Sequence, residues 1–255
     1  MKQDAAGCDL LCISPHSDDA EIALGGTLRN LADAGRSVWL CDLTRGELGS
    51  NGTPEIRWRE AAAAAEILGV AGRLQFDLPD GFISEQSEIQ VAVVADVIRR
   101  LRPRWVVAAP MPNRHPDHQA VPGLVRKGAF MARLAAWRPE VPAGRIWPED
   151  AALPGPAERW ECEAVCTVCL PGERPDAYFD VSDVWDAKLA ALRCYASQFE
   201  PGTGARATMI NDPAFSREVE RWARGWGFRA GVELAEALHV EAAPVYRDLP
   251  GERWT

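Results

Sequence analysis

Short apolar segments alternate with longer segments of helical periodicity through the first half of this chain. The expected strands lie at residues 9–14, 37–44, 73–78 and 104–109, and the expected helices at residues 21–34, 54–68, 87–101 and 119–137. Strands and helices that alternate at this spacing form βαβ units with right-handed crossovers, so helices cover both faces of a parallel sheet. We therefore predict an α/β fold with a Rossmann-like, mostly parallel sheet in the strand order 3-2-1-4-5.

The second half of the chain extends this pattern. Strands are expected at residues 160–170, as the fifth of the predicted order, and at 178–181; helices are expected at residues 182–198, capped by Ser182, and at 213–238. Phe215, Val219, Trp222 and Trp226 form an apolar stripe on the last helix, which indicates a core or subunit contact. Residues 138–158 form an irregular connection rather than a domain linker, so residues 1–255 are predicted to be a single domain.

Composition limits the classes of partner. The net charge is −9 and the pI is about 5.1, whereas nucleic-acid binding needs a clustered basic face. No apolar run is long enough to span a membrane, and the first residues lack the pattern of a signal peptide. The seven cysteines are an odd number, as is typical of reduced thiols. We expect a cytoplasmic protein with a small-molecule substrate and with no nucleic-acid or membrane partner.

Two segments that contain histidine each follow an expected strand. Ser14-Pro15-His16-Ser17-Asp18-Asp19 comes after the first strand, and Asn113-Arg114-His115-Pro116-Asp117-His118 comes after the fourth. In the predicted order these strands are neighbours at the topological switch point, where ligands bind beyond the carboxyl ends of the strands. Imidazole and carboxylate groups hold borderline and hard divalent metals, so the two loops predict one metal site.

Other interpretations of these segments stay open at this stage. Asp18 and Asp19 could simply cap the following helix, and the second segment could be a polar turn. We favour Asp19 as a metal ligand and Asp18 as the carboxylate that faces the water. A dinucleotide site is disfavoured because the first βα turn has no GxGxxG motif, and Gly25-Gly26 falls inside the expected helix.

A cysteine cluster is a second candidate for a metal site. Cys162, Cys166 and Cys169 lack a second CxxC pair and a nearby histidine, so buried thiols on a strand are favoured over a structural zinc site. His239 is expected to be a pocket wall or surface residue rather than a fourth ligand.

The motifs also carry a family resemblance. Pro15-His16-Ser17-Asp18-Asp19 resembles the PHPDD motif, and His115-Pro116-Asp117-His118 the HPDH motif, of the LmbE/PIG-L family of zinc-dependent N-deacetylases. Further segments are similar to the branch that deacetylates N-acetylglucosaminyl-malate in bacillithiol biosynthesis; they are residues 43–49, 52–57, 78–82 and 195–199. Taken together, the similar segments extend over nearly the whole chain.

The resemblance implies an LmbE-like fold, one catalytic zinc ion (Zn²⁺) per chain, and assembly into homo-oligomers such as trimers or hexamers. By position, it implies His16, Asp19 and His118 as metal ligands, Asp18 as general base, His115 as acid or oxyanion stabiliser, and Asp117 as the residue that orients His115. It also implies that Glu47, Arg57, Asp80 and Arg114 line the substrate pocket.

Two positions depart from the family pattern. Ser17 stands where proline is usual; this removes a φ constraint, for which its hydroxyl could compensate by bonding a free amide at the helix start. Asn51 stands where the bacillithiol branch often has a basic residue, which leaves the identity of the substrate open.

These observations predict hydrolysis of the acetamide of an N-acetylglucosamine-type glycoside, with N-acetylglucosaminyl-malate as the favoured substrate. Guanidinium groups match carboxylates in a bidentate way, so Arg57 and Arg114 suit an anionic aglycone. The alternatives are a bacillithiol S-conjugate amidase, a deacetylase of another N-acetylglucosamine conjugate, and a non-catalytic zinc-binding assembly protein.

Overall fold

One eight-stranded sheet organises the described part of the chain. The computed structural model describes residues 7–111, 115–138, 140–141, 157–200, 202 and 205–241, and the backbone of residues 146 and 147. The strand order is β5-β3-β2-β1-β4-β6-β8-β7.

The strands are β1 Cys8–Ser14, β2 Val38–Thr44, β3 Gly72–Leu78, β4 Pro103–Ala108, β5 Ile146–Trp147, β6 Ala164–Val168, β7 Ala177–Asp180 and β8 Ala235–Val240. The helices are α1 Asp19–Asp33, α2 Pro54–Leu68, α3 Glu88–Leu101, α4 Pro116–Ala132, α5 Trp185–Arg193, α6 Ala196–Phe199 and α7 Pro213–Ala230, with a 3₁₀ turn, η1, at Ser182–Val184.

The parallel part of the sheet confirms the predicted order 3-2-1-4-5, with β6 as the fifth strand. The pairs β3-β2, β2-β1, β1-β4 and β4-β6 are all parallel. The remaining strands β5, β8 and β7 pair antiparallel at the two ends of this block. The strand order reverses between β1 and β4, so the loops that follow these two strands leave the same edge of the sheet side by side.

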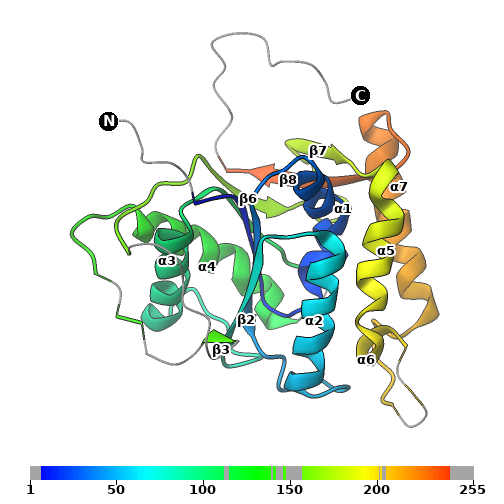
Figure 1. Ribbon diagram of the computed structural model, residues 1–255, viewed down its shortest axis with the longest axis horizontal. Helices are drawn as coiled ribbons and strands as arrows, with labels where there is room; N and C mark the ends of the chain where they lie inside the picture. Colours follow the sequence, from blue (N-terminus) through cyan, green and yellow to red (C-terminus); the bar gives the residue numbers. More distant parts are fainter. Residues whose placement is uncertain are drawn as a thin grey trace.

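Helices cover both faces of the sheet. Alternate residues of β1 point in opposite directions: Leu11 and Ile13 pack into the cluster with α3 and α4, whereas Leu10 and Cys12 pack into the cluster with α1, α2 and α5. Figure 1 shows α3 and α4 on one side of the sheet and α1, α2 and α5 on the other. The near-continuous burial of the strand is typical of a parallel sheet covered on both faces.

Helix boundaries follow local sequence signals. Pro54 is the first residue of α2, the Thr53 hydroxyl accepts the backbone N–H of Ile56 at 3.3 Å, and Gly69 ends the helix with φ +69°. The helices α1 and α4 begin earlier than predicted, at Asp19 and Pro116. The predicted metal ligands Asp19 and His118 therefore lie in the first turns of two helices.

The predictions of helices at residues 182–198 and 213–238 were partly wrong. The helix α7 ends at Ala230 because Gly231 takes a left-handed conformation with φ +81°, and residues 235–240 form strand β8 between β6 and β7. The predicted helix 182–198 is broken into η1, α5 and α6, and the Ser182 hydroxyl donates to Asp180 rather than capping a helix.

The apolar stripe on α7 is mostly core. Phe215, Val219 and Trp226 are buried, and Trp222 packs against the cluster that contains Phe215 and Val219. Across the residues that the structure describes, no helix combines the length and the apolar character needed to cross a bilayer.

Candidate active site

The two His-containing loops meet at the reversal point of the sheet. His16 follows β1, and His115 and His118 lie at the start of α4, which follows β4. The ring of His16 lies 4.8 Å from that of His115 and 5.2 Å from that of His118, between centroids. Metal chemistry and sheet topology, which were separate arguments from the sequence, thus point to one place.

His16, Asp19 and His118 turn one ligand atom each toward a common point. The Nδ1 atom of His16 lies 3.2 Å from Asp19 Oδ2 and 3.1 Å from His118 Nε2, and His118 Nε2 lies 3.4 Å from Asp19 Oδ2. Tetrahedral zinc with bonds of about 2.0–2.2 Å to nitrogen and oxygen requires ligand separations of roughly 3.4 Å. Two nitrogens and one carboxylate oxygen at this spacing fit a borderline divalent ion.

Asp80 fixes the orientation of the His16 ring from the side opposite Asp19 and His118. The Nε2 atom of His16 lies 3.0 Å from Asp80 Oδ1 and 3.5 Å from Asp117 Oδ2, so this nitrogen carries a proton and Nδ1 is left for a metal. Burial lowers the pKa of His16, but hydrogen bonds to Asp117, Asp19 and Asp80 outweigh it and hold the pKa well above its usual value.

His118 is oriented by the backbone. The N–H of Met111 donates to His118 Nδ1 at 2.8 Å, which places the proton of the neutral ring on Nε2, facing Asp19. A cation on Nε2 has to displace this proton, so metal binding at this site is coupled to a proton shift.

The adjacent carboxylates Asp18 and Asp19 have opposite electrostatic surroundings. Burial raises the pKa of Asp19, but the charges of His118 and His16 overcome this and lower it. For Asp18, burial dominates and raises the pKa, although Arg57 opposes the shift. Asp18 is 2% exposed, and its Oδ2 atom has no hydrogen-bond partner among the described residues. Such an oxygen can accept a proton from a bound water.

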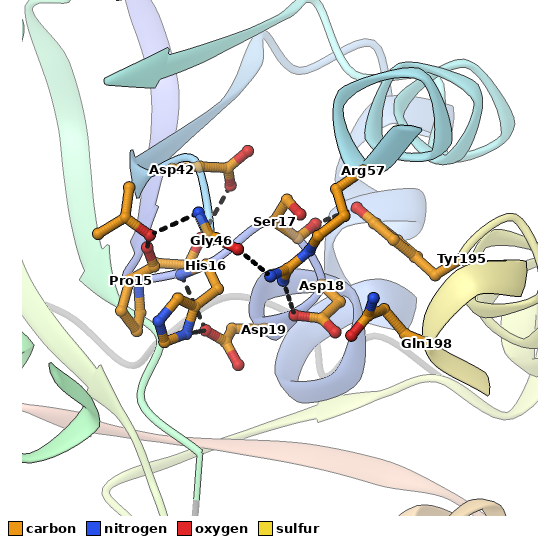
Figure 2. Close-up of polar contacts among 12 residues, drawn as sticks. Pro15, His16, Ser17, Asp18, Asp19, Asp42, Gly46, Arg57, Tyr195 and Gln198 are labelled. Atoms are coloured by element: carbon orange, nitrogen blue, oxygen red, sulfur yellow. Dashed lines mark hydrogen bonds and ion pairs between the residues drawn. The ribbon is translucent and has the colours of Figure 1, made fainter. Parts of the chain in front are cut away.

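Arg57 contacts Asp18, which directly precedes Asp19 in the sequence. Figure 2 shows its guanidinium between the Gly46 carbonyl, at 3.3 Å from Nη1, and the Asp18 carboxylate, at 3.5 Å from Nη2. Gly46 has φ +62°, and a Cβ atom on it would overlap Arg57 Nη1. Arg57 was predicted to line the substrate pocket; in the structure it is only 5% exposed, and its guanidinium is held by Gly46 and Asp18.

Glu47 and Asp80, which were predicted to contact substrate, link two loops to each other. Glu47 Oε1 accepts the backbone N–H of Asp80 at 2.8 Å, and Asp80 Oδ2 accepts the backbone N–H of Leu48 at 3.0 Å. The contact to His16 and the one to Leu48 hold the pKa of Asp80 at about 2, against the effect of burial. The loops after β2 and β3 therefore support the ring of His16.

His115 and Asp117 lie at the start of α4. The backbone N–H of Asp117 donates to His115 Nδ1 at 3.3 Å, which leaves the proton of the neutral ring on Nε2. The Asp117 carboxylate accepts the backbone N–H groups of Gly81 at 2.8 Å and Ile83 at 3.0 Å, and it faces His16. A backbone hydrogen bond thus links Asp117 to His115, and the orienting role of Asp117 stays a prediction.

Three further positions from the sequence can be placed. Arg114 lies outside the described residues. The Ser17 hydroxyl is buried without a partner among the described residues, so it does not compensate for the missing proline by bonding a free amide at the helix start. Asn51 donates to and accepts from the backbone of Arg206, at 2.9 and 3.0 Å, which ties the loop after β2 to the segment before α7.

A buried charged network beneath the first loop was missed from the sequence. Arg73 on β3 binds Asp42 through two nitrogens, at 2.7 and 2.9 Å, and Glu21 at 2.5 Å. The Arg73 guanidinium and the Tyr195 hydroxyl both donate to the Ser17 carbonyl, and the approach of Tyr195 is visible in Figure 2. The available signal was a charged residue inside each of two predicted strands, Asp42 and Arg73.

Comparison with known proteins adds independent evidence. A family model described as PIG-L: GlcNAc-PI de-N-acetylase matches residues 11–129, which contain both His segments. The diacetylchitobiose deacetylase of Thermococcus kodakarensis is 32% identical over 203 residues, covering 74% of this chain and 70% of that protein. The 4-oxalmesaconate hydratase of Pseudomonas putida is 28% identical over 201 residues, covering 74% and 73%. A probable N-acetyl-alpha-D-glucosaminyl L-malate deacetylase 2 of Bacillus cereus is 28% identical over 204 residues, covering 75% and 84%.

A solved structure extends the similarity to the fold. The conserved protein TT1542 from Thermus thermophilus superposes with a TM-score of 0.77 at 31% identity, covering 96% of this chain and 100% of that one. The sequence similarity, the matched motifs and the shared fold together establish that this chain belongs to the PIG-L family of deacetylases.

Proposed function

We propose that this protein is a metal-dependent N-deacetylase that hydrolyses the acetamide of an N-acetylglucosamine-type glycoside. The observation that carries the proposal is the convergence of His16 Nδ1, Asp19 Oδ2 and His118 Nε2 within 3.1–3.4 Å beside the unpartnered oxygen of Asp18. A purely structural cation site would have no use for a buried carboxylate with a free oxygen next to its ligands.

His16, Asp19 and His118 would hold one zinc ion. When bound, the ion would supply Lewis acidity, which lowers the pKa of a water to about 7 and polarises the acetamide carbonyl. Asp80 would hold the His16 ring in the orientation that ligation needs, through the contact at 3.0 Å.

The remaining side chains account for the proton transfers. Asp18 takes a proton from the attacking water as its oxygen bonds to the carbonyl carbon, and its raised pKa suits that role. His115 Nε2 donates a hydrogen bond to the developing oxyanion. The C–N bond then breaks as the leaving nitrogen gains the proton that Asp18 took from the water, giving the free amine and acetic acid, which ionises to acetate. Arg57 holds Asp18 in place and opposes its protonation before the reaction.

The finer substrate proposal is N-acetylglucosaminyl-malate in bacillithiol biosynthesis. Its support is the set of similar sequence segments and the 28% identity to the probable malate deacetylase of Bacillus cereus. Because Arg57 is buried, we assign recognition of the substrate carboxylate to Arg114. Arg114 directly precedes His115 in the sequence. The single domain over residues 1–255, the homo-oligomer and the cytoplasmic location stay predictions.

The decisive experiment measures products from a substrate panel. Purified protein is incubated with N-acetylglucosaminyl-malate, diacetylchitobiose and free N-acetylglucosamine, and acetate and primary amine are quantified separately. We expect equal amounts of acetate and amine, the highest kcat/KM on the malate conjugate, and no product from Asp18→Asn. The matched control is Asp77→Asn, an exposed acid near the end of β3.

Other outcomes separate the competing functions. Amine release only from a thiol-adduct amide would indicate the S-conjugate amidase. The similarity to a hydratase of Pseudomonas putida makes water addition to a carbon–carbon double bond a further candidate, which would release no acetate. The absence of turnover on every acetamide, with metal bound, would contradict the deacetylase proposal.

A further inference from the structure

A second cluster of metal-ligating side chains lies where β6 and β8 pair. Cys169 directly follows β6, Glu173 lies in the turn after it, Asp176 directly precedes β7, and His239 is on β8. The backbone N–H of Cys169 donates to the Ala237 carbonyl at 2.9 Å, so the end of β6 is fixed against β8. None of these four side chains belongs to the candidate active site.

The geometry of this cluster resembles that of an open metal site. The Sγ atom of Cys169, a carboxylate oxygen of Glu173 and a ring nitrogen of His239 all lie within 4.8 Å of one another. His239 Nε2 is 3.1 Å from Glu173 Oε2. The side chains of His239 and Glu173 are 36% and 47% exposed, so an ion can reach the cluster from solvent.

Backbone contacts hold the ligands in place. Glu173 Oε2 accepts the N–H of Leu170 at 2.7 Å. Asp176 Oδ2 lies 3.6 Å from His239 Nδ1 and accepts the N–H of Val240 at 3.0 Å. A carboxylate on the Nδ1 side of an imidazole favours a proton on Nδ1 and leaves Nε2 for a metal, an arrangement that recurs around metal-ligating histidines.

We propose that Cys169, Glu173 and His239 bind a second divalent cation of the zinc class, with Asp176 as the residue that orients His239. One thiolate, one imidazole and one carboxylate form a mixed donor set that suits zinc rather than magnesium or calcium. Thiolate and carboxylate together balance the two positive charges of the ion. This proposal does not depend on the catalytic activity of the first site.

Binding at this cluster exchanges a proton for the metal. In the metal-free protein Cys169 is a free, buried thiol that is only 3% exposed. When the cation binds, the S–H bond breaks, the proton leaves to solvent, and the sulfur lone pair forms the bond to the metal. The ion would tie the turn after β6 to β8, which adds a link across the antiparallel end of the sheet.

The sequence pattern had suggested a different set of ligands. Cys162 packs against the hydrophobic cluster on the α3 and α4 side of the sheet, whereas Cys166 is buried in the cluster on the opposite side. The three cysteines therefore do not converge, and the histidine that the CxxxCxxC pattern lacked comes from β8, 70 residues after Cys169. Only strand pairing brings these two residues together.

Cobalt substitution distinguishes the two sites, because the first site has no sulfur ligand. Metal-free protein is titrated with Co²⁺, and absorption is followed in the visible and near-ultraviolet. We expect a sulfur-to-cobalt charge-transfer band with the wild type, a total of two ions per chain by elemental analysis, and a rise in Tm on binding of the second ion. The band should persist in His118→Ala, which removes a ligand of the first site only.

Variants assign the band to these residues. Cys169→Ser should abolish it and Glu173→Gln should weaken the second site at least tenfold, whereas the matched control Cys194→Ser, a half-buried thiol on the α5 side, should leave it unchanged. A wild type that binds one ion without a charge-transfer band would overturn the proposal and identify His239 as a salt-bridged histidine. A band that survives in Cys169→Ser would overturn it equally, because the sulfur would then come from another cysteine.

Discussion

Replacement of Arg73 by methionine tests whether the buried network supports the catalytic loop. Arg73 binds Asp42 and Glu21 at 2.5–2.9 Å, and all three side chains are at most 3% exposed. The guanidinium also donates to the carbonyl of Ser17, which stands between His16 and Asp18. Methionine keeps much of the volume but removes the charge and every donor.

The expected loss of stability follows from the buried carboxylates of Asp42 and Glu21, which would remain without their partner. Removing one partner from a buried ion pair destabilises a protein by about 3–5 kcal/mol. In a domain of this size, 1 kcal/mol shifts Tm by roughly 2–4 °C, so we expect a decrease of roughly 6–20 °C. The matched control is Arg104→Met. Arg104 also lies on a strand, but it pairs with Glu163 at 43% and 50% exposure, so its loss should cost at most about 1 kcal/mol.

The loss of stability in Arg73→Met should depend on pH with a defined sign. Burial already raises the pKa of Asp42 and Glu21 above their ordinary values of 3.8 and 4.5, and Arg73 opposes both shifts. Without Arg73 the folded protein binds protons more tightly than the unfolded chain, so the stability of the variant is lost as pH rises through the folded pKa values. The deficit relative to wild type should therefore be larger at pH 8 than at pH 5.

Thermal unfolding followed by circular dichroism at both pH values, with metal content measured on the same samples, checks these expectations. Asp42→Asn in the Arg73→Met background should recover part of the lost Tm at pH 8. A decrease no larger than that of Arg104→Met, or a deficit that grows toward pH 5, would refute the reasoning.

The remaining predictions concern the active site. His118→Ala should lose the metal while Asp18→Asn retains it, measured by elemental analysis; equal losses would mean that the two carboxylates are assigned wrongly. His115→Ala should lower kcat by roughly 10²-fold with metal retained, and an unchanged kcat would remove His115 from the mechanism. Asp80→Asn should weaken metal affinity by roughly 10–100-fold in a chelator competition assay, and unchanged affinity would show that His16 needs no carboxylate to orient it. Arg57→Ala should lower kcat by tenfold or more at pH 7 on both the malate conjugate and free N-acetylglucosamine, because an opposite charge within about 4–6 Å shifts a carboxyl pKa by about 1–3 units. A rise in KM for the malate conjugate alone, with kcat unchanged, would instead indicate that Arg57 contacts the aglycone.

The order of the parallel strands could be predicted because each βαβ unit is specified by local signals. Thr53, Pro54 and Gly69 mark both ends of α2 within the sequence itself, and α2 spans the predicted residues 54–68. Strand β8 could not be found in this way, because residues 235–240 contain alanine, glutamate and leucine, which favour helix in isolation. Its strand conformation is fixed by pairing with β6 and β7, and such tertiary contacts override local propensity.

The candidate site was predictable to the extent that it depends on strand ends. His16 and His118 come together because β1 and β4 are neighbours, and the predicted strand order already placed these two strands side by side. The partners of Arg57 were not predictable, because the contact with Asp18 depends on the path of the loop that contains Gly46. The buried links made by Asp80 have the same origin: loops from two strands meet, and their sequences do not show which groups will face each other.

The division of roles between Asp18 and Asp19 can be argued from physical chemistry without the family resemblance. Adjacent carboxylates that are equally buried would repel each other and compete for one proton. The structure resolves this by asymmetric partners: Asp19 faces His16 and His118, which lower its pKa, whereas Asp18 faces Arg57, and burial still raises its pKa. A ligand must stay ionised, and a base must be able to accept a proton near neutral pH, so these environments support our proposal that Asp19 binds the metal and Asp18 faces the water.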